Sequence, residues 1–171
     1  MRIVTVCLGN VCRSPAAEAV LLRRLAEAGL PDVTVSSAGT ADYHVGDEPH
    51  PHSVAEGQGR GYSFDSLGRQ FQAAHFDEAD LVLAMDYSNE ADVLALARTP
   101  HDAAKVVRLG AFAPGAPASG DVLDVPDPWG QPPEAYARMY DQIEEAVDGL
   151  VAAIRDGSVG EVVAAHRALP R

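Results

Sequence analysis

The chain has few cysteines, little aromatic content and no long hydrophobic run. Only two cysteines occur among 171 residues, Cys7 and Cys12. They are so close together that a disulfide between them would close too small a loop to stabilise a domain, so we interpret them as reduced thiols. No apolar stretch reaches membrane-spanning length, and residues 1–7 lack the layout of a signal peptide. We therefore expect a cytoplasmic protein.

Basic residues are also scarce. Lys105 is the only lysine, and 25 acidic residues outnumber 13 lysines and arginines, which gives a formal net charge of −12. Such an acidic chain is not expected to bind nucleic acid. An anionic ligand would have to be held by local cations and backbone amides, because the long-range field is repulsive.

The hydrophobic residues, 47% of the chain, fall into short runs that alternate with helical patterns. The runs predict buried strands at 2–7, 33–37, 81–85 and 106–109. Helical spacing predicts helices over 16–28, 89–98 and 132–154, and Ser14 and Ser88 are expected as N-caps of the first two. This alternation predicts one α/β domain with a parallel sheet covered by helices on both faces.

The densest chemistry lies in residues 6–15, Val-Cys-Leu-Gly-Asn-Val-Cys-Arg-Ser-Pro, between the first strand and the first helix. Amides at a helix start form a cradle for a tetrahedral anion, and Gly9 and Asn10 accept the positive φ that helps such a loop to curl. The same field and the guanidinium of Arg13 favour a thiolate on Cys7. Arg13 can also bind two phosphate oxygens. The segment predicts attack of sulfur on phosphorus.

Cys7-x5-Arg13-Ser14-Pro15, with Gly9-Asn10 inside, resembles the phosphate loop of the low-molecular-weight protein tyrosine phosphatases. The resemblance implies a four-stranded parallel sheet of order 2-1-3-4 with this loop after strand 1. It implies a phosphatase domain over residues 1–155, followed by a tail over 156–171 that forms a short helix or is disordered. The residues expected to surround the phosphate are Leu8, Gly9, Asn10, Val11, Cys12 and Ser14.

A departing phenolate leaves more readily when an acid protonates it. Val125–Trp129 resembles the family's Asp-Pro-aromatic segment, so Asp127 is the expected general acid and base, and Asp124 is the competing carboxylate. The resemblance also implies that Tyr43 and Trp129 form two walls of a slot for an aromatic ring.

Three further features concern the support of this loop and metal binding. The resemblance implies that Ser37 hydrogen-bonds Asn10, and that Ser66 stands where the family commonly has a histidine supporting the same asparagine. His50 and His52 are neighbouring imidazoles without a third ligand in a motif, which favours an ordinary loop over a zinc site.

The expected reaction is hydrolysis of protein phosphotyrosine and of small aryl phosphates, with no metal or cofactor. The expected partners are phosphotyrosine-containing proteins, with no nucleic acid and no membrane, and the chain is expected to be a monomer or weak dimer. Protein arginine phosphatases are an alternative, although they tend to carry Thr where this chain has Val11. Arsenate reductases of the thiol-relay type use cysteines beyond the loop, and this chain has none. A redox-sensing phosphate-binding module, in which Cys12 traps oxidised Cys7, is the alternative from another class.

Overall fold

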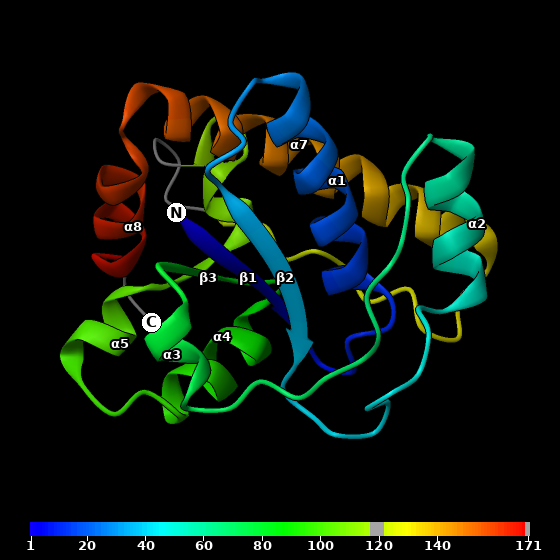
Figure 1. The fold of residues 1–171 in the computed structure, drawn as a ribbon, viewed down its shortest axis with the longest axis horizontal. Coiled ribbons are helices and arrows are strands. Elements are labelled where there is room, and N and C mark those ends of the chain that lie inside the picture. Colours follow the sequence, from blue (N-terminus) through cyan, green and yellow to red (C-terminus); the bar gives the residue numbers. More distant parts are fainter. Residues whose placement is uncertain (117–121, 170–171) are drawn as a thin grey trace.

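The computed structural model describes residues 1–116 and 122–169. Its centre is a parallel sheet in the order β2-β1-β3-β4, as the resemblance implied (Figure 1). The strands are β1 (Arg2–Cys7), β2 (Thr34–Gly39), β3 (Leu81–Ala84) and β4 (Val106–Arg108). In the register of the central strand, Cys7 lies opposite Gly39, and Val6 lies between Ala38 and Ala84.

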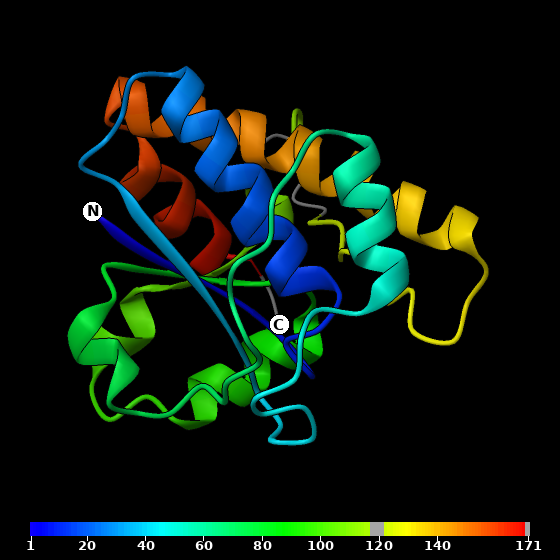
Figure 2. The ribbon, with the colours of Figure 1, turned by 45° about the vertical axis from the view of Figure 1, so that its right-hand side comes forward.

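Helices cover both faces of the sheet (Figures 1 and 2). One face carries α1 (Arg13–Glu27), α7 (Pro133–Asp156) and α8 (Val159–Arg167), with α2 (Pro51–Gly59) packed beside α1 and α7. The other face carries α3 (His75–Glu78) and α4 (Tyr87–Ala95), and α5 (Pro100–Ala104) and the 3-10 turn η1 (Leu109–Phe112) flank β4.

The two inner strands, β1 and β3, are mostly apolar because both of their faces are buried. In β1, Ile3 and Cys7 point into the core under α1 and α7, whereas Val4 and Val6 point into the core under α4. All four apolar residues of this strand, and Thr5 between them, are nearly inaccessible to solvent, as expected of a central parallel strand. The strand therefore ends at a fixed place, with Cys7 at its carboxyl end.

The two predicted N-caps are wrong. The first helix begins at Arg13, so Ser14 lies inside its first turn and its hydroxyl bonds to the loop instead of capping. In α4 the cap is Asp86, whose carboxylate accepts the N–H of Asn89 at 2.6 Å, and Ser88 lies within the helix. A charged acceptor next to the helix start outcompetes a serine two residues later.

None of the helices in residues 1–116 and 122–169 is both long and apolar enough to cross a membrane.

Candidate active site

The loop between β1 and α1 curls tightly around the end of the strand. Asn10 has φ of 56°, so positive φ is confirmed there, but Gly9 is not in that region, and its prediction is wrong. Gly9 is needed for space, because a Cβ there would lie 3.1 Å from Cδ2 of His44. Gly39 of β2 lies beneath the loop, and a Cβ on it would come within 2.7 Å of the Leu8 carbonyl oxygen.

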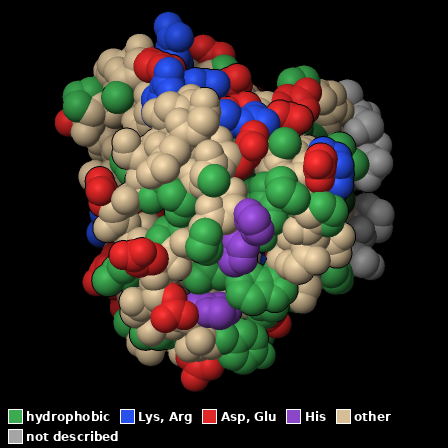
Figure 3. Space-filling model, turned by 90° about the vertical axis from the view of Figure 1, so that its right-hand side faces the viewer, with side chains coloured by type: hydrophobic (Ala, Val, Ile, Leu, Met, Phe, Trp, Pro, Cys, Tyr) green, Lys and Arg blue, Asp and Glu red, His purple; other side chains and the backbone are tan. Residues whose placement is uncertain are grey.

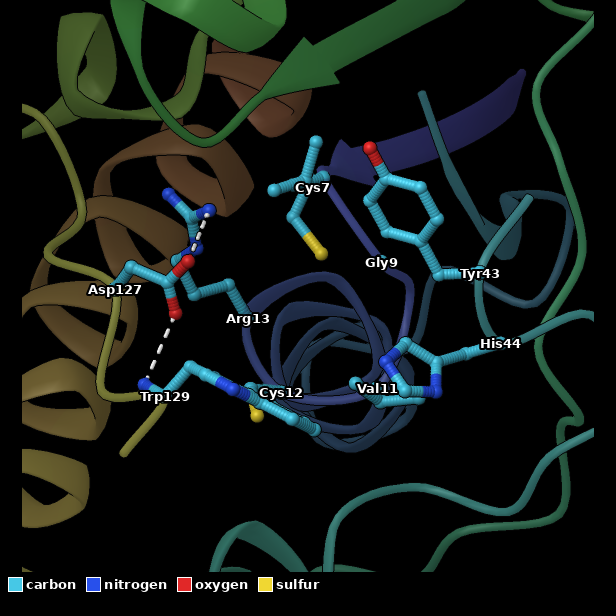
Figure 4. Close-up of a pocket in the computed structure, with 10 residues that line it drawn as sticks. Cys7, Gly9, Val11, Cys12, Arg13, Tyr43, His44, Asp127 and Trp129 are labelled. Carbon is cyan, nitrogen blue, oxygen red and sulfur yellow. Dashed lines mark hydrogen bonds and ion pairs between the residues drawn. The ribbon is translucent and has the colours of Figure 1, made fainter. Parts of the chain in front are cut away.

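Cys7 is only 3% exposed, yet it lines a cavity of about 380 Å³ that opens to solvent (Figure 4). The N–H of Asn10 donates to the sulfur at 3.3 Å, and the hydroxyl of Ser14 lies 3.1 Å from it. Donors directed at sulfur stabilise negative charge on it. This environment suits a nucleophilic thiolate.

Asn10 ties the loop to the rest of the molecule. Its amide donates to the Ser14 hydroxyl at 2.9 Å, and its carbonyl oxygen accepts the N–H of Arg69 at 2.9 Å. The Arg69 side chain in turn donates to the carbonyl of Ser37 and to the hydroxyl of Ser36. The strained residue of the loop is thus fixed to β2 through Arg69.

The prediction that Ser37 hydrogen-bonds Asn10 is wrong, and Ser66, at the position of the family's usual histidine, bonds elsewhere as well. Both hydroxyls donate to the same oxygen of Glu18 in α1, Ser66 at 2.9 Å. A carboxylate is a stronger acceptor than an amide oxygen, and Glu18 lies one turn after Ser14 on the helix that the loop enters. No local sequence signal marks Glu18, because its partners lie 19 and 48 residues away.

Arg13 is buried, 3% exposed, and its guanidinium reaches the rim of the cavity. It is paired with Asp86, donates to Asp127 at 3.0 Å, and donates to the carbonyl of Val125 at 3.3 Å. Burial alone would lower the pKa of Arg13, but Cys7 and the two carboxylates raise it, so the group stays charged. Asp86 was missed from the sequence, although an aspartate before a helix is a recognisable cap.

Of the two candidate acids, Asp127 lies at the cavity and Asp124 does not line it. The Asp127 carboxylate is 42% exposed and accepts the N–H of Trp129 at 3.1 Å (Figure 4). The Asp124 carboxylate accepts the N–H of Tyr87 and pairs with Arg108. The geometry therefore leaves Asp127 as the carboxyl group available to a bound ligand.

Aromatic rings border the mouth of the cavity. Tyr43 and Trp129 line it, as predicted, and both are exposed, by 72% and 52%. His44, which the sequence did not single out, lines it as well and lies 5.2 Å from the Trp129 ring. The face in Figure 3 carries histidines among apolar side chains. A flat ring entering this mouth meets rings on both sides.

His50 stands behind this aromatic border. Its ring stacks on Tyr136 at 5.4 Å and meets the edge of Trp129 at 5.2 Å. Its Nδ1 accepts the backbone N–H of His52 and lies 3.2 Å from the Tyr136 hydroxyl, so it needs a lone pair there. Burial lowers the pKa of His50, and His52 and His44 lower it further. His50 thus supports the Trp129 wall as a neutral imidazole.

Cys12, the other thiol, lies under the loop. It lines the cavity and is 4% exposed, and burial, followed by the charges of Cys7 and Asp127, raises its pKa to about 12. Both cysteines are free thiols. Over residues 1–116 and 122–169, no group of three or more His, Cys, Asp or Glu side chains is placed to hold a metal ion.

The comparisons with known proteins agree with this geometry. The sequence model of the low molecular weight phosphotyrosine protein phosphatase family matches residues 2–159. A low molecular weight protein-tyrosine-phosphatase of Streptomyces coelicolor is 42% identical over 156 residues, which cover 91% of this chain and 94% of that protein. The crystal structure of a protein tyrosine phosphatase from Entamoeba histolytica has a TM-score of 0.86 at 31% identity, covering 93% of this chain and 99% of the other.

A structure of the YwlE arginine phosphatase, with a phosphorylated serine in its active site, is also similar. Its TM-score is 0.79 at 28% identity, and the match covers 91% of this chain and 96% of that one.

In this parallel sheet, strand β1 ends at a cysteine that lies in a loop bordered by an arginine, at the start of a helix. This arrangement is typical of a phosphate-binding α/β protein. The family match over residues 2–159 then shows that the chain belongs to the low molecular weight phosphotyrosine protein phosphatase family. The resemblance seen in the loop sequence is confirmed.

Proposed function

We propose that this protein hydrolyses phosphotyrosine in proteins, and small aryl phosphates, through a phosphocysteine intermediate. The single observation that carries the proposal is the convergence on one cavity of a thiol, a buried guanidinium and a half-exposed carboxyl group, from Cys7, Arg13 and Asp127. These three groups supply a nucleophile, a phosphate ligand and a proton donor.

Phosphate binding would use the loop amides at the start of α1 and the guanidinium of Arg13. The helix start favours negative charge, and a planar guanidinium matches two phosphate oxygens. In the transition state the three phosphate oxygens move into one equatorial plane, and donors already placed around that plane lower the barrier. With a net charge of −12, the binding energy must come from these local groups.

In the first step the Cys7 sulfur forms a bond to phosphorus while the bond from phosphorus to the phenolic oxygen breaks. Asp127, protonated, gives its proton to that oxygen, and tyrosine leaves as a neutral phenol. In the second step a water attacks the phosphocysteine, Asp127 takes a proton from the water, and the sulfur–phosphorus bond breaks. Inorganic phosphate leaves, and the Cys7 thiolate and protonated Asp127 are regenerated.

The depth of the sulfur supports an aryl phosphate as substrate. Cys7 is 3% exposed at the base of the cavity, whereas Tyr43 and Trp129 stand exposed at its mouth. A phosphotyrosine side chain is long enough to pass between the two rings and reach the sulfur, while phosphoserine is shorter by the length of a benzene ring. Offset or edge contacts with the two rings would add about 0.5–1.5 kcal/mol each.

Phosphoarginine is the second candidate substrate, because the fold of the YwlE arginine phosphatase is closely similar. The cavity of this protein is lined by the apolar side chain of Val11, between Cys7 and the aromatic mouth. The apolar side chain of Val11 favours the phenyl ring of phosphotyrosine over the charged guanidinium of phosphoarginine. Parallel hydrolysis assays of phosphotyrosine and phosphoarginine peptides decide between the two substrates.

The proposal is tested by steady-state hydrolysis of aryl phosphates. Cys7→Ser is expected to abolish turnover, and Asp127→Asn to lower kcat/KM by roughly 10²–10⁴-fold for phenols that leave poorly. Asp32→Asn, at an exposed position remote from the cavity, is the matched control and should leave the rates unchanged. Retained turnover in Cys7→Ser would remove the proposed nucleophile.

A further inference from the structure

A buried ionic contact joins the last helix to the back of the site. Glu90 of α4 is 4% exposed and His166 of α8 is 7% exposed, and Nε2 of His166 lies 2.8 Å from Oε1 of Glu90. The other ring nitrogen, Nδ1, is buried and has no hydrogen-bond partner among the described residues. A carboxylate oxygen can only accept, so Nε2 of His166 donates to Glu90.

The second oxygen of Glu90 faces a cation. Nε of Arg108, at the end of β4, lies 3.2 Å from Oε2 of Glu90. A buried carboxylate requires such pairing, because the cost of removing it from water is several kcal/mol. Glu90 thus holds the guanidinium of Arg108 on one side, while His166 fixes the orientation of Glu90.

The other end of the Arg108 guanidinium binds the segment that carries Asp127. Its Nη1 donates to the Asp124 carboxylate at 2.9 Å and to the carbonyl of Val122 at 3.0 Å. The same Asp124 oxygen accepts the N–H of Tyr87 at the start of α4. Arg108 therefore fastens residues 122–124 to the helix that Asp86 caps.

From Asp124 the chain reaches the proposed acid within three residues. Val125 lies between them, with its N–H donating to Met85 at 2.8 Å and its carbonyl accepting from Arg13 at 3.3 Å. Asp127 itself is 42% exposed and is contacted by the Arg13 guanidinium at 3.0 Å and the N–H of Trp129 at 3.1 Å, and where its backbone lies depends on how the preceding residues are held. A shift of about 1 Å in a catalytic group is enough to reduce the rate strongly.

We propose that α8 takes part in catalysis at a distance: His166, Glu90 and Arg108 are positioning residues that hold the segment 122–125 so that Asp127 is aligned with the leaving oxygen. This inference rests on the proposed role of Asp127 as general acid. It assigns a task to α8, most of which lies beyond the residues 2–159 matched by the family model.

The test uses a series of aryl phosphates whose phenols differ in pKa, from 4-nitrophenyl to 4-methoxyphenyl phosphate. A working general acid keeps the dependence of log kcat/KM on leaving-group pKa shallow, and loss of alignment makes it steeper. His166→Leu, which removes the donor to Glu90, is expected to lower kcat/KM about tenfold for the poorest leaving group and less than twofold for 4-nitrophenyl phosphate. His166→Gln, which restores a donor, is expected to recover the shallow slope.

Two further variants complete the test. Glu90→Gln keeps the shape of the side chain but removes the charge that holds Arg108, so it should steepen the slope even if His166→Leu does not fold. His101→Leu changes an exposed histidine of α5 and should have no effect.

The inference is overturned if His166→Leu lowers kcat/KM equally for all leaving groups, because α8 would then only stabilise the fold. If His166→Leu does not fold, the same result in Glu90→Gln overturns it. If Asp127→Asn also leaves the dependence of log kcat/KM on leaving-group pKa unchanged, Asp127 is not the general acid. If Asp127→Asn steepens this dependence and the other variants do not, Asp127 is the acid but α8 does not position it.

Discussion

At the scale of single residues, the loop depends on one strained position. Asn10 adopts φ of 56°, a conformation that costs a residue with a side chain about 1–2 kcal/mol. Its amide recovers this cost by bonding to the Ser14 hydroxyl and to the N–H of Arg69. The same residue also directs its own N–H at the sulfur of Cys7.

Substitutions at Asn10 separate strain from hydrogen bonding. Asn10→Ala should lower the free energy of unfolding by about 2–4 kcal/mol, because it loses two hydrogen bonds and keeps the strain. Asn10→Gly loses the same bonds but tolerates positive φ, so it should be about 1 kcal/mol more stable than the alanine variant. Urea unfolding of both variants measures the difference, and equal stabilities would contradict the strain.

The histidine behind Trp129 makes stability depend on pH. Because the pKa of His50 is lowered in the folded protein, the unfolded chain binds a proton first as pH falls. The stability that His50 contributes is complete above its unfolded pKa of about 6.5 and is lost as pH falls from there toward the folded pKa. Protonation also removes the lone pair that accepts the N–H of His52.

We expect the free energy of unfolding to decrease between pH 7 and pH 5 more in the wild type than in His50→Gln, which has no proton to take up. Urea titrations at several pH values give the two curves. His101→Gln, at an exposed position, is the control and should follow the wild type. Parallel curves for the wild type and His50→Gln would contradict the lowered pKa of His50.

At the scale of elements, the strands were predictable and the helix starts were not. Short apolar runs such as 81–85 identify buried strands, because few other structures bury four consecutive side chains. The start of a helix depends on which nearby side-chain oxygen accepts its free N–H groups. Where two possible caps lie two residues apart, as Asp86 and Ser88 do, the spacing of the sequence does not show which of them is the cap. Ser14 was likewise expected to cap the first helix, whereas its hydroxyl lies 3.1 Å from the Cys7 sulfur.

Asp86 both caps α4 and pairs with Arg13, and substitutions can separate these two roles. Asp86→Ala loses the cap and should destabilise the protein by about 1 kcal/mol or more. Asp86→Asn keeps an acceptor for the N–H of Asn89 and should be closer to the wild type in stability. Both variants lose the charge paired with Arg13, so both should lower kcat/KM for aryl phosphates. A normal kcat/KM in Asp86→Asn would show that this pairing is dispensable.

At the scale of the whole molecule, the sequence predicted the fold class and the segments that meet at the site. The family resemblance implied that the loop after β1 and the segment at Asp127 meet at one site, and the structure brings both to the same cavity. The pairing of Glu18 with Ser37 and Ser66 was not predictable, because any of several polar groups could have met there. His166 lies in residues to which the sequence assigned no function.

The acidic surface sets how substrates approach. With a net charge of −12, an acidic phosphotyrosine peptide is repelled and a basic one attracted. We expect kcat/KM for the acidic peptide to rise, and that for the basic peptide to fall, as the ionic strength increases from about 0.01 M to 0.1 M and the Debye length shortens from about 30 Å to 10 Å. Stopped assays with the two peptides measure this, and the same salt response for both would contradict long-range repulsion.

The position of β1 between β2 and β3 determines the order in which the molecule comes apart. Amide protons of a strand that is paired on both sides exchange with solvent only in the most complete openings, whereas those of β4, a three-residue strand at the edge, exchange through smaller ones. Partial opening at β4 would release Arg108 and the segment beside it while Cys7 keeps its place. If the proposed mechanism holds, a warmed or mildly denatured enzyme would then still form a bond between Cys7 and phosphorus after Asp127 had lost its alignment with the departing oxygen.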